Sequence, residues 1–236
     1  MPIVPSAILY DLNIGRADVR PDSVMGYHAA ASASSDAPAE GNIGVGTGAS
    51  VGKMFGLKLA MKSGLGTASL DIGGGVIVGA IVAVNAFGDV VDSQTGGILA
   101  GLRSGNVGPL RVGKKDFFAD TLAMMKSPAG RGILGFATRA NTVIGVVATD
   151  AKLNKAQATK VAQMAQNGVA RTIRPAHTML DGDVIFALST GTKKADVSII
   201  GTFAAEVMAA AIVRAVKMAA PAGGLPGLNL EKQPGG

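Results

Sequence analysis

The apolar residues of this chain fall into continuous runs and runs with helical spacing. Continuous runs rich in β-branched residues predict strands at 76–85, 142–149 and 184–189. Apolar residues three or four positions apart predict two helices, one beginning after Asn154 as its N-cap and one over 201–218. Because the run 76–85 shows no polar alternation, we expect a central strand that is buried on both faces. These elements together predict a mixed α/β fold.

The rest of the chain has a weaker pattern. Residues 3–12 predict a short strand broken by Pro5, and the Ala/Ser/Asp/Pro-rich stretch 18–42 predicts one helix and a loop. Residues 88–139 are rich in Gly, Lys and Arg, and they predict a long loop with one short helix at 117–125. The Pro/Gly-rich end, 219–236, predicts a disordered tail.

Composition narrows the classes of protein and partner. The chain has 236 residues, of which 48% are hydrophobic, and it contains no cysteine, which excludes disulfides, thiolate catalysis and cysteine-based zinc sites. The net charge is +6, but two Tyr and no Trp supply little surface for base stacking, so we expect no nucleic-acid partner. The longest strongly apolar stretch, 76–84, is shorter than a bilayer span of about 20 residues. The N-terminus lacks the pattern of a secretory signal, so we expect a cytoplasmic protein without membrane contact.

Two motifs imitate a ligand site. The glycine cluster at 44–53 looks like a phosphate loop, but a Walker loop requires Gly at Thr47 and Ser or Thr at Met54. His177 precedes an Asp-Gly-Asp turn, and a metal site there would need a further nitrogen or sulfur donor. We therefore predict neither a metal nor another cofactor, and we expect His177 to hydrogen-bond the turn.

The dipeptide Asn141-Thr142 opens an apolar run, and the carboxylate pair Asp181-Gly182-Asp183 follows about forty residues downstream. A Thr hydroxyl at the start of a buried strand can attack the carbonyl that precedes it, and the freed Thr is then an N-terminal nucleophile. The alternative is that Asn-Thr only opens a strand and that Asp-Gly-Asp is an ordinary capped turn.

Six segments, in this order, resemble the L-aminopeptidase/D-esterase family: GNIGVGTGASVGK, KSGLGTAS, IVAVNAFGDVVD, NTVIGVVATDA, KAQATKVAQMAQNGVARTIRP and HTMLDGDVIFAL. The family includes DmpA-type aminopeptidases, β-peptidyl aminopeptidases and endo-type nylon-oligomer hydrolases. The resemblance implies a four-layer α-β-β-α sandwich like that of N-terminal-nucleophile hydrolases, with a different connectivity. It also implies one domain over 1–218, cut into 1–141 and 142–218, and a homotetramer of cleaved protomers.

The resemblance assigns roles to individual residues. Thr142 matches the nucleophile, and Asn141 precedes the bond that is cleaved. Asp181 and Asp183 match the positions that assist cleavage and orient the nucleophile. Three further residues match positions in the family's active site: Tyr10 and Asn85, which line it and help bind the oxyanion, and Lys53, for which Lys62 is a competing choice.

The implied activity is that of a self-cleaving aminopeptidase or amidase that acts on short peptides or small amides without a metal or cofactor. An acyltransferase of the ornithine-acetyltransferase type also uses a Thr nucleophile and is one alternative. Family members carry an additional N-terminal region before the point that corresponds to Pro2. A non-catalytic fragment with a structural or interaction role is therefore the second alternative.

Overall fold

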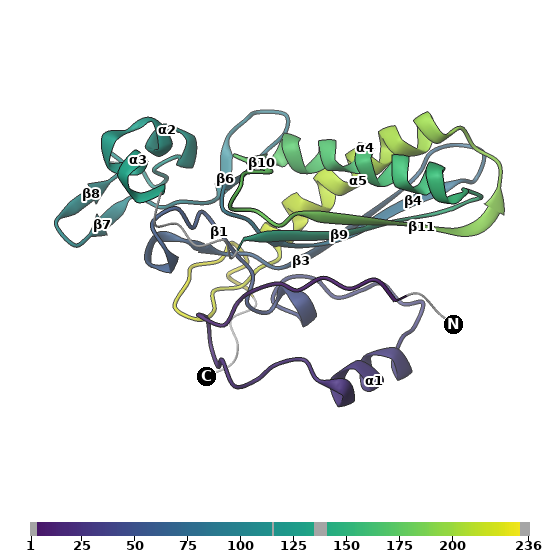
Figure 1. The fold of residues 1–236 in the computed structure, drawn as a ribbon, viewed down its shortest axis with the longest axis horizontal. Coiled ribbons are helices and arrows are strands. Elements are labelled where there is room, and N and C mark those ends of the chain that lie inside the picture. The colour runs from purple at the N-terminus through teal and green to yellow at the C-terminus, as the bar shows by residue number, and fades with distance from the viewer. Residues whose placement is uncertain (1–3, 115, 135–140, 232–236) are drawn as a thin grey trace.

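The computed structural model describes residues 4–114, 116–134 and 141–231. Its centre is a four-stranded sheet in the order β11-β9-β4-β3, in which β4 is antiparallel to both neighbours and β9 is parallel to β11 (Figure 1). The strands are β3 (Leu65–Asp71), β4 (Ile77–Asn85), β9 (Thr142–Ala151) and β11 (Val184–Lys193). The three strands predicted from continuous apolar runs are therefore confirmed, and β3 is an additional one.

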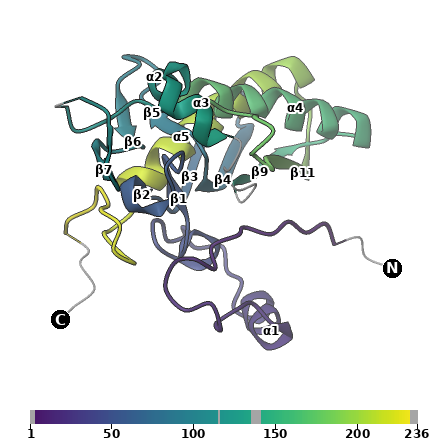
Figure 2. The same cartoon turned by 60° about the vertical axis from the view of Figure 1, so that its left-hand side comes forward.

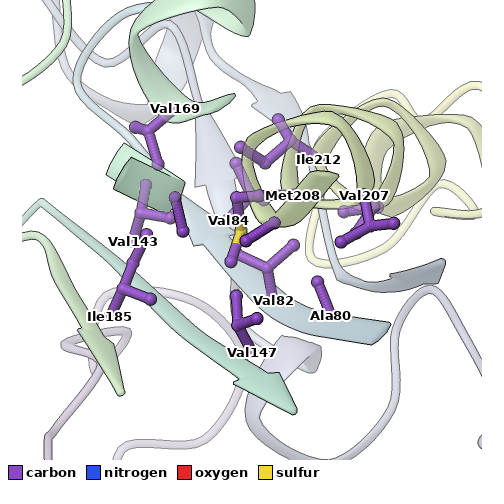
Figure 3. Packing of buried hydrophobic residues seen from close by; sticks show 14 of the residues in the cluster. Ala80, Val82, Val84, Val143, Val147, Val169, Ile185, Val207, Met208 and Ile212 are labelled. Atoms are coloured by element: carbon purple, nitrogen blue, oxygen red, sulfur yellow. The ribbon is translucent and has the colours of Figure 1, made fainter. Parts of the chain in front are cut away.

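Two long helices cover one face of this sheet, α4 (Lys155–Thr172) and α5 (Val197–Lys217) (Figure 1). Both predicted helices are thus confirmed, and Asn154 caps α4 with a reciprocal capping box. Alternate β4 and β9 residues, such as Val82 and Val147, pack against Met208 and Ile212 of α5 (Figure 3). Of the described helices, α5 alone has the length and hydropathy of a membrane span, and most of its window is buried.

The opposite face of the sheet is only partly covered. Burial alternates along β9, so that Ile144 and Val146 are half-buried while their neighbours are buried. Ile81 of β4 lies beside Val146 in the register and is half-buried as well. Within the described residues, β4 is therefore buried on its helix side from Val78 onward, but on the opposite face only at its end, at Ala83 and Asn85. The reason is that both long helices lie on the same side.

The segment between β4 and β9 contains regular structure where the sequence predicts mainly a loop. It forms β5 (Asp89–Val91), β6 (Ile98–Ala100), β7 (Gly105–Val107), β8 (Leu110–Val112), α2 (Thr121–Lys126) and α3 (Pro128–Leu134), and β5 also pairs with β10 (Ile173–Arg174). The buried Asp89 carboxylate organises it, because it accepts hydrogen bonds from the Leu102 and Thr121 amides, both at 2.7 Å. Strands of three residues carry too little periodicity to be recognised in a sequence.

The two ends of the chain also differ from expectation. Residues 4–12 form no strand, and the N-terminal stretch contributes only α1 (Ser23–Ala31), which is exposed throughout and lies apart from the sheet (Figure 2). The C-terminal stretch is not a free tail over 219–231, since Leu225 is buried and the Pro226 carbonyl accepts the Lys62 amide hydrogen. These backbone and apolar contacts order a Pro/Gly-rich sequence that has no helix or strand of its own.

A short strand pair and two 3-10 helices complete the layout next to the end of β4. Strands β1 (Ser50–Val51) and β2 (Met61–Lys62) form an antiparallel pair, flanked by the 3-10 helices η1 (Gly44–Gly46) and η2 (Leu57–Leu59). Although the glycine cluster 44–53 does not form a phosphate loop followed by a helix, it delivers the β1 backbone to the side chain of Asn85. It therefore contributes to the site that is described next.

Candidate active site

The candidate site lies where three strand ends meet. Asn85, the last residue of β4, is the register partner of Thr142, the first residue of β9. Asp181 closes a turn that starts at Thr178, and Gly182 and Asp183 lead from this turn into the parallel strand β11. Asn141 forms an isolated parallel bridge with Asp181. Sheet pairing therefore brings together residues that lie more than fifty positions apart in the sequence.

The peptide bond between Asn141 and Thr142 is held by the turn. The Asn141 carbonyl oxygen accepts the Gly182 amide hydrogen at 2.8 Å, and the Asn141 side-chain amide donates to the Leu180 carbonyl at 3.1 Å. Asn141 is almost fully buried. A Cβ atom on Gly182 would lie 3.3 Å from the Thr142 hydroxyl oxygen, so the glycine lets the turn approach the hydroxyl closely.

Asp183 links the turn to the start of β9. One of its carboxylate oxygens accepts the Val143 amide hydrogen at 2.8 Å, and the other lies 3.0 Å from Nδ1 of His177. Burial raises the pKa of Asp183, and the Val143 amide and His177 oppose that rise. The expected contact between His177 and the turn is thus confirmed.

Asp181 links the turn to the loop that follows β4. Its carboxylate accepts hydrogen bonds from the Phe87 amide at 3.2 Å and from the Thr178 hydroxyl at 2.6 Å. These bonds fix the carboxylate between the ends of β4 and β11. The two carboxylates of the Asp-Gly-Asp turn therefore point to separate partners on either side of Gly182.

Lys53 and Asn85 form the opposite wall of the site. The Lys53 ammonium donates to the Asn85 side-chain oxygen at 2.7 Å and to the Asn85 carbonyl at 2.9 Å. Burial lowers the pKa of Lys53 to about 7, against the attraction of Asp181. The side-chain oxygen of Asn85 also accepts the Ser50 amide hydrogen at 3.2 Å, and its NH₂ donates to the Tyr10 carbonyl at 3.2 Å.

Lys62 occupies a different environment. Its side chain is fully buried, and its ammonium donates to the carbonyls of Gly46, Ala49 and Ser63 at 3.2, 2.8 and 2.6 Å. Burial lowers the pKa of Lys62 to about 8. These bonds tie together the backbone that carries β1, whereas Lys53 is the lysine that contacts Asn85.

A pocket of about 190 Å³ opens on the Lys53 side of the site. Its lining includes Tyr10, Asp11, Ser50, Lys53, Asn85 and Asn141. The uncut Asn141 therefore forms part of the pocket wall, directly before Thr142. Across the described ranges, no group of three or more His, Cys, Asp or Glu side chains is arranged to hold a metal ion.

The structure brings the sequence-predicted residues together around the Asn141-Thr142 bond. Tyr10 contacts Asn85 through its backbone carbonyl oxygen, and the side chain of Tyr10 is largely exposed. Sequence reasoning missed two backbone donors, the amides of Gly182 and Ser50. The glycine inside the Asp-Gly-Asp turn is a signal for the first, whereas a backbone amide in a glycine-rich loop has no signature of its own.

Comparison with known proteins decides the family. A family model described as peptidase family S58 matches residues 1–229. The chain belongs to this family. It is 41% identical over 251 aligned residues to an uncharacterized aminopeptidase, ML1167, of Mycobacterium leprae, with 96% of this chain and 64% of that protein covered.

The chain is also 29% identical over 231 residues to the 6-aminohexanoate-oligomer endohydrolase of Kocuria sp.. That match covers 91% of this chain and 61% of the other protein. The chain thus spans a little under two thirds of the length of these relatives.

The fold also has a solved counterpart, an L-aminopeptidase D-Ala-esterase/amidase from Ochrobactrum anthropi that is described as a variant of the Ntn hydrolase fold. The TM-score is 0.52 at 21% sequence identity, and the match covers 82% of this chain and 48% of that one. The expected mixed α/β, Ntn-hydrolase-like fold class is therefore confirmed. The long helices α4 and α5 form one helical layer, and the four-stranded sheet forms one sheet layer, of the expected α-β-β-α sandwich (Figure 1).

Proposed function

We propose that this S58 member is a self-processing aminopeptidase or amidase whose nucleophile is Thr142. The observation that carries the proposal is the Asn141 carbonyl, which accepts the Gly182 amide hydrogen at 2.8 Å directly beside the Thr142 hydroxyl. The bond is the ladder hydrogen bond of the parallel bridge between Asn141 and Asp181, so the sheet itself holds an amide donor at this carbonyl. A scissile carbonyl needs such a donor, because its oxygen gains negative charge during attack.

Self-cleavage begins with attack of the Thr142 hydroxyl oxygen on the Asn141 carbonyl carbon. The hydroxyl proton passes to a carboxylate of the Asp-Gly-Asp segment, which later returns it to the Thr142 nitrogen. The Gly182 amide stabilises the oxyanion of the tetrahedral intermediate. The C–N bond then breaks, the Thr142 nitrogen takes up a proton as an amine, and an ester joins Asn141 to Thr142. Water hydrolyses that ester and releases the Asn141 carboxylate and the Thr142 hydroxyl.

The amine released on Thr142 then acts as the base for substrate hydrolysis. An α-amino group has a pKa of about 7.7 to 8.0 in model peptides, so near neutrality it can accept the hydroxyl proton and return it to the leaving amine. Asp183 lies at the next amide of β9, and its carboxylate is placed to hold the resulting ammonium. Asn85 lies opposite Thr142 in the sheet and is assigned to the substrate oxyanion.

The pocket indicates the class of substrate. It lies on the Asn141 side of the bond, and its wall combines the Lys53 ammonium with polar atoms of Ser50 and Asn85. Small amides with a polar acyl group match this volume and polarity. The names of the relatives, an aminopeptidase and a 6-aminohexanoate-oligomer endohydrolase, support short peptides or ω-amino amides, and we propose a homotetramer as the working assembly.

The test is the intact mass of the purified chain beside those of Thr142→Ala and Thr142→Ser. The wild type is expected to yield two fragments, one ending at Asn141 and one beginning at Thr142. The Ser variant keeps a hydroxyl nucleophile and should also be cut, whereas the Ala variant should stay whole. A wild-type chain that is folded by circular dichroism and still uncut would refute self-processing in this chain.

A cleaved chain then permits a substrate screen. Aminoacyl p-nitroanilides with α- and β-amino acids, and linear 6-aminohexanoate oligomers, are incubated with wild type and Thr142→Ala. Release of p-nitroaniline or shorter oligomers by the wild type alone supports hydrolysis. Acyl transfer to ornithine without hydrolysis would instead support the acyltransferase alternative.

A further inference from the structure

The loop between β10 and β11 places an imidazole behind the turn that carries both carboxylates. Nδ1 of His177 lies 3.0 Å from a carboxylate oxygen of Asp183, whose side chain is 6% exposed while that of His177 is 38% exposed. We propose that His177 is a positioning residue, which holds Asp183 against the first amides of β9 so that its carboxylate faces Thr142, as proton acceptor during self-cleavage and as partner of the freed amine afterwards. This inference rests on the proposed function, because it assigns a role within the same site.

The backbone conformation of His177 indicates that a specific contact holds this residue in place. Its φ is +54°, in the left-handed region that non-glycine residues avoid, and only Asp120 shares this feature among the non-glycine residues that the structure describes. A left-handed conformation is unfavourable for a residue with a Cβ, so a contact must hold it. The hydrogen-bonded contact with Asp183 offsets that cost, since it turns the imidazole inward from a loop.

Two groups hold the Asp183 carboxylate, one at each oxygen. The Val143 amide holds one oxygen at 2.8 Å, and His177 holds the other. A carboxylate that is bound at both oxygens cannot rotate about its terminal bond. With His177 absent, Asp183 would keep the bond to β9 but lose the one that sets the plane of the carboxylate.

The charges around the turn show why a second donor is useful. Two carboxylates flank Gly182, and Asp181 and burial both raise the pKa of Asp183. His177 acts on Asp183, whereas Asp181 attracts the Lys53 ammonium and accepts the Phe87 amide and Thr178 hydroxyl hydrogens. The imidazole therefore favours an ionised Asp183, which is the form that binds an ammonium.

Two substitutions separate the hydrogen bond from the backbone conformation. Both Gly and Asn adopt positive φ readily, but only Asn places an N–H donor near the position of Nδ1. His177→Gly thus removes the donor and His177→Asn retains it. Circular dichroism and thermal unfolding of both variants establish that the fold is preserved.

Self-cleavage is followed by mass spectrometry after pulse-labelled cell-free synthesis and transfer to buffers between pH 5 and 9. We expect His177→Gly to be cleaved at least tenfold more slowly at pH 6, with the acidic limb of its rate profile shifted to higher pH because the pKa of Asp183 rises. His177→Asn should restore the rate to within about threefold. In an Asp183→Asn background, His177→Gly should have no further effect, because the two residues act as one unit.

The outcomes are distinct. A Gly variant that is cleaved at the wild-type rate with an unchanged acidic limb overturns the role of His177, and so does an Asn variant that is as slow as the Gly variant. An additive effect in the Asp183→Asn background overturns it as well. A folded wild-type chain that stays intact contradicts the proposed function and, with it, this role. A wild-type chain that is cleaved, together with any of the three outcomes above, contradicts the role of His177 alone.

Discussion

Replacing Lys53 with Met tests whether a buried, neutral lysine forms the wall of the site. The folded state lowers the pKa of Lys53 from 10.5 to about 7. Between these values the unfolded chain holds a proton that the folded chain lacks, so the free energy of unfolding rises with pH across this window and is lowest below pH 7. The full difference corresponds to at most about 5 kcal/mol, because each pKa unit corresponds to about 1.4 kcal/mol.

The interval from pH 7 to pH 8 isolates this residue. Lys62 titrates in the folded chain at about 8, so its contribution develops mainly above that pH. Half of Lys53 is protonated at pH 7. We therefore expect its contribution to the free energy of unfolding to rise by about 1 kcal/mol between pH 7 and pH 8. Partial exposure of the side chain at the pocket reduces this to about 0.5 to 1 kcal/mol.

Urea unfolding at pH 7.0, 7.5 and 8.0 measures the effect, with Thr142→Ala as the background so that the chain stays in one piece. Lys53→Met should abolish the rise, whereas the control Lys58→Met removes an exposed lysine and should leave it unchanged. Groups common to all variants cancel in the difference between curves. Parallel curves for the Lys53→Met variant and its parent would refute the assignment of a neutral lysine at this site.

Four further substitutions test individual contacts. Gly66→Ala should destabilise the protein by about 3 kcal/mol in urea unfolding, because the new Cβ would lie 2.0 Å from a carbonyl oxygen of α5. Lys62→Met should cost about 3 kcal/mol or more, because three backbone carbonyls lose their donor. Asp89→Asn should lower the thermal midpoint by several degrees, corresponding to about 1 to 3 kcal/mol, because its NH₂ meets an amide donor. Gly182→Ala should slow self-cleavage several-fold without unfolding the chain, since its Cβ would approach the Thr142 hydroxyl oxygen to 3.3 Å.

The elements that sequence reasoning located are those with a strong local pattern. Strand β9 is an apolar run rich in β-branched residues, and α4 combines a capping box at Asn154 with regularly spaced apolar residues. In α4 the pattern and the packing agree, because the apolar residues that repeat are the ones that face the core. The same reasoning placed a turn at Asp181-Gly182-Asp183, which is slightly too late in the chain: the turn spans 178–181, and Asp181 already pairs with Asn141 ahead of β11.

Elements that depend on distant partners could not be located in this way. Strand β3 contains Gly66, which weakens any strand pattern, and its small size matters only because α5 packs directly on it. The insertion between β4 and β9 is ordered around Asp89, a buried carboxylate whose partners lie 13 and 32 positions away. An aspartate in a Gly-rich sequence carries no sign that it will be buried.

The two lysines show how far local sequence can define a site. Lys53 ends the glycine-rich stretch 44–53, and Lys62 follows a mainly apolar one. Both are withdrawn from water, and burial lowers the pKa of each. What separates them is the acceptor set: Lys53 meets the side chain of Asn85 at the end of a strand, whereas Lys62 meets only backbone carbonyls. A lysine bound to backbone carbonyls secures a loop, whereas a lysine bound to the side chain opposite Thr142 is the one assigned to the proposed site. Because that distinction arises from the register of β4 with β9, it becomes evident only when the sheet is assembled.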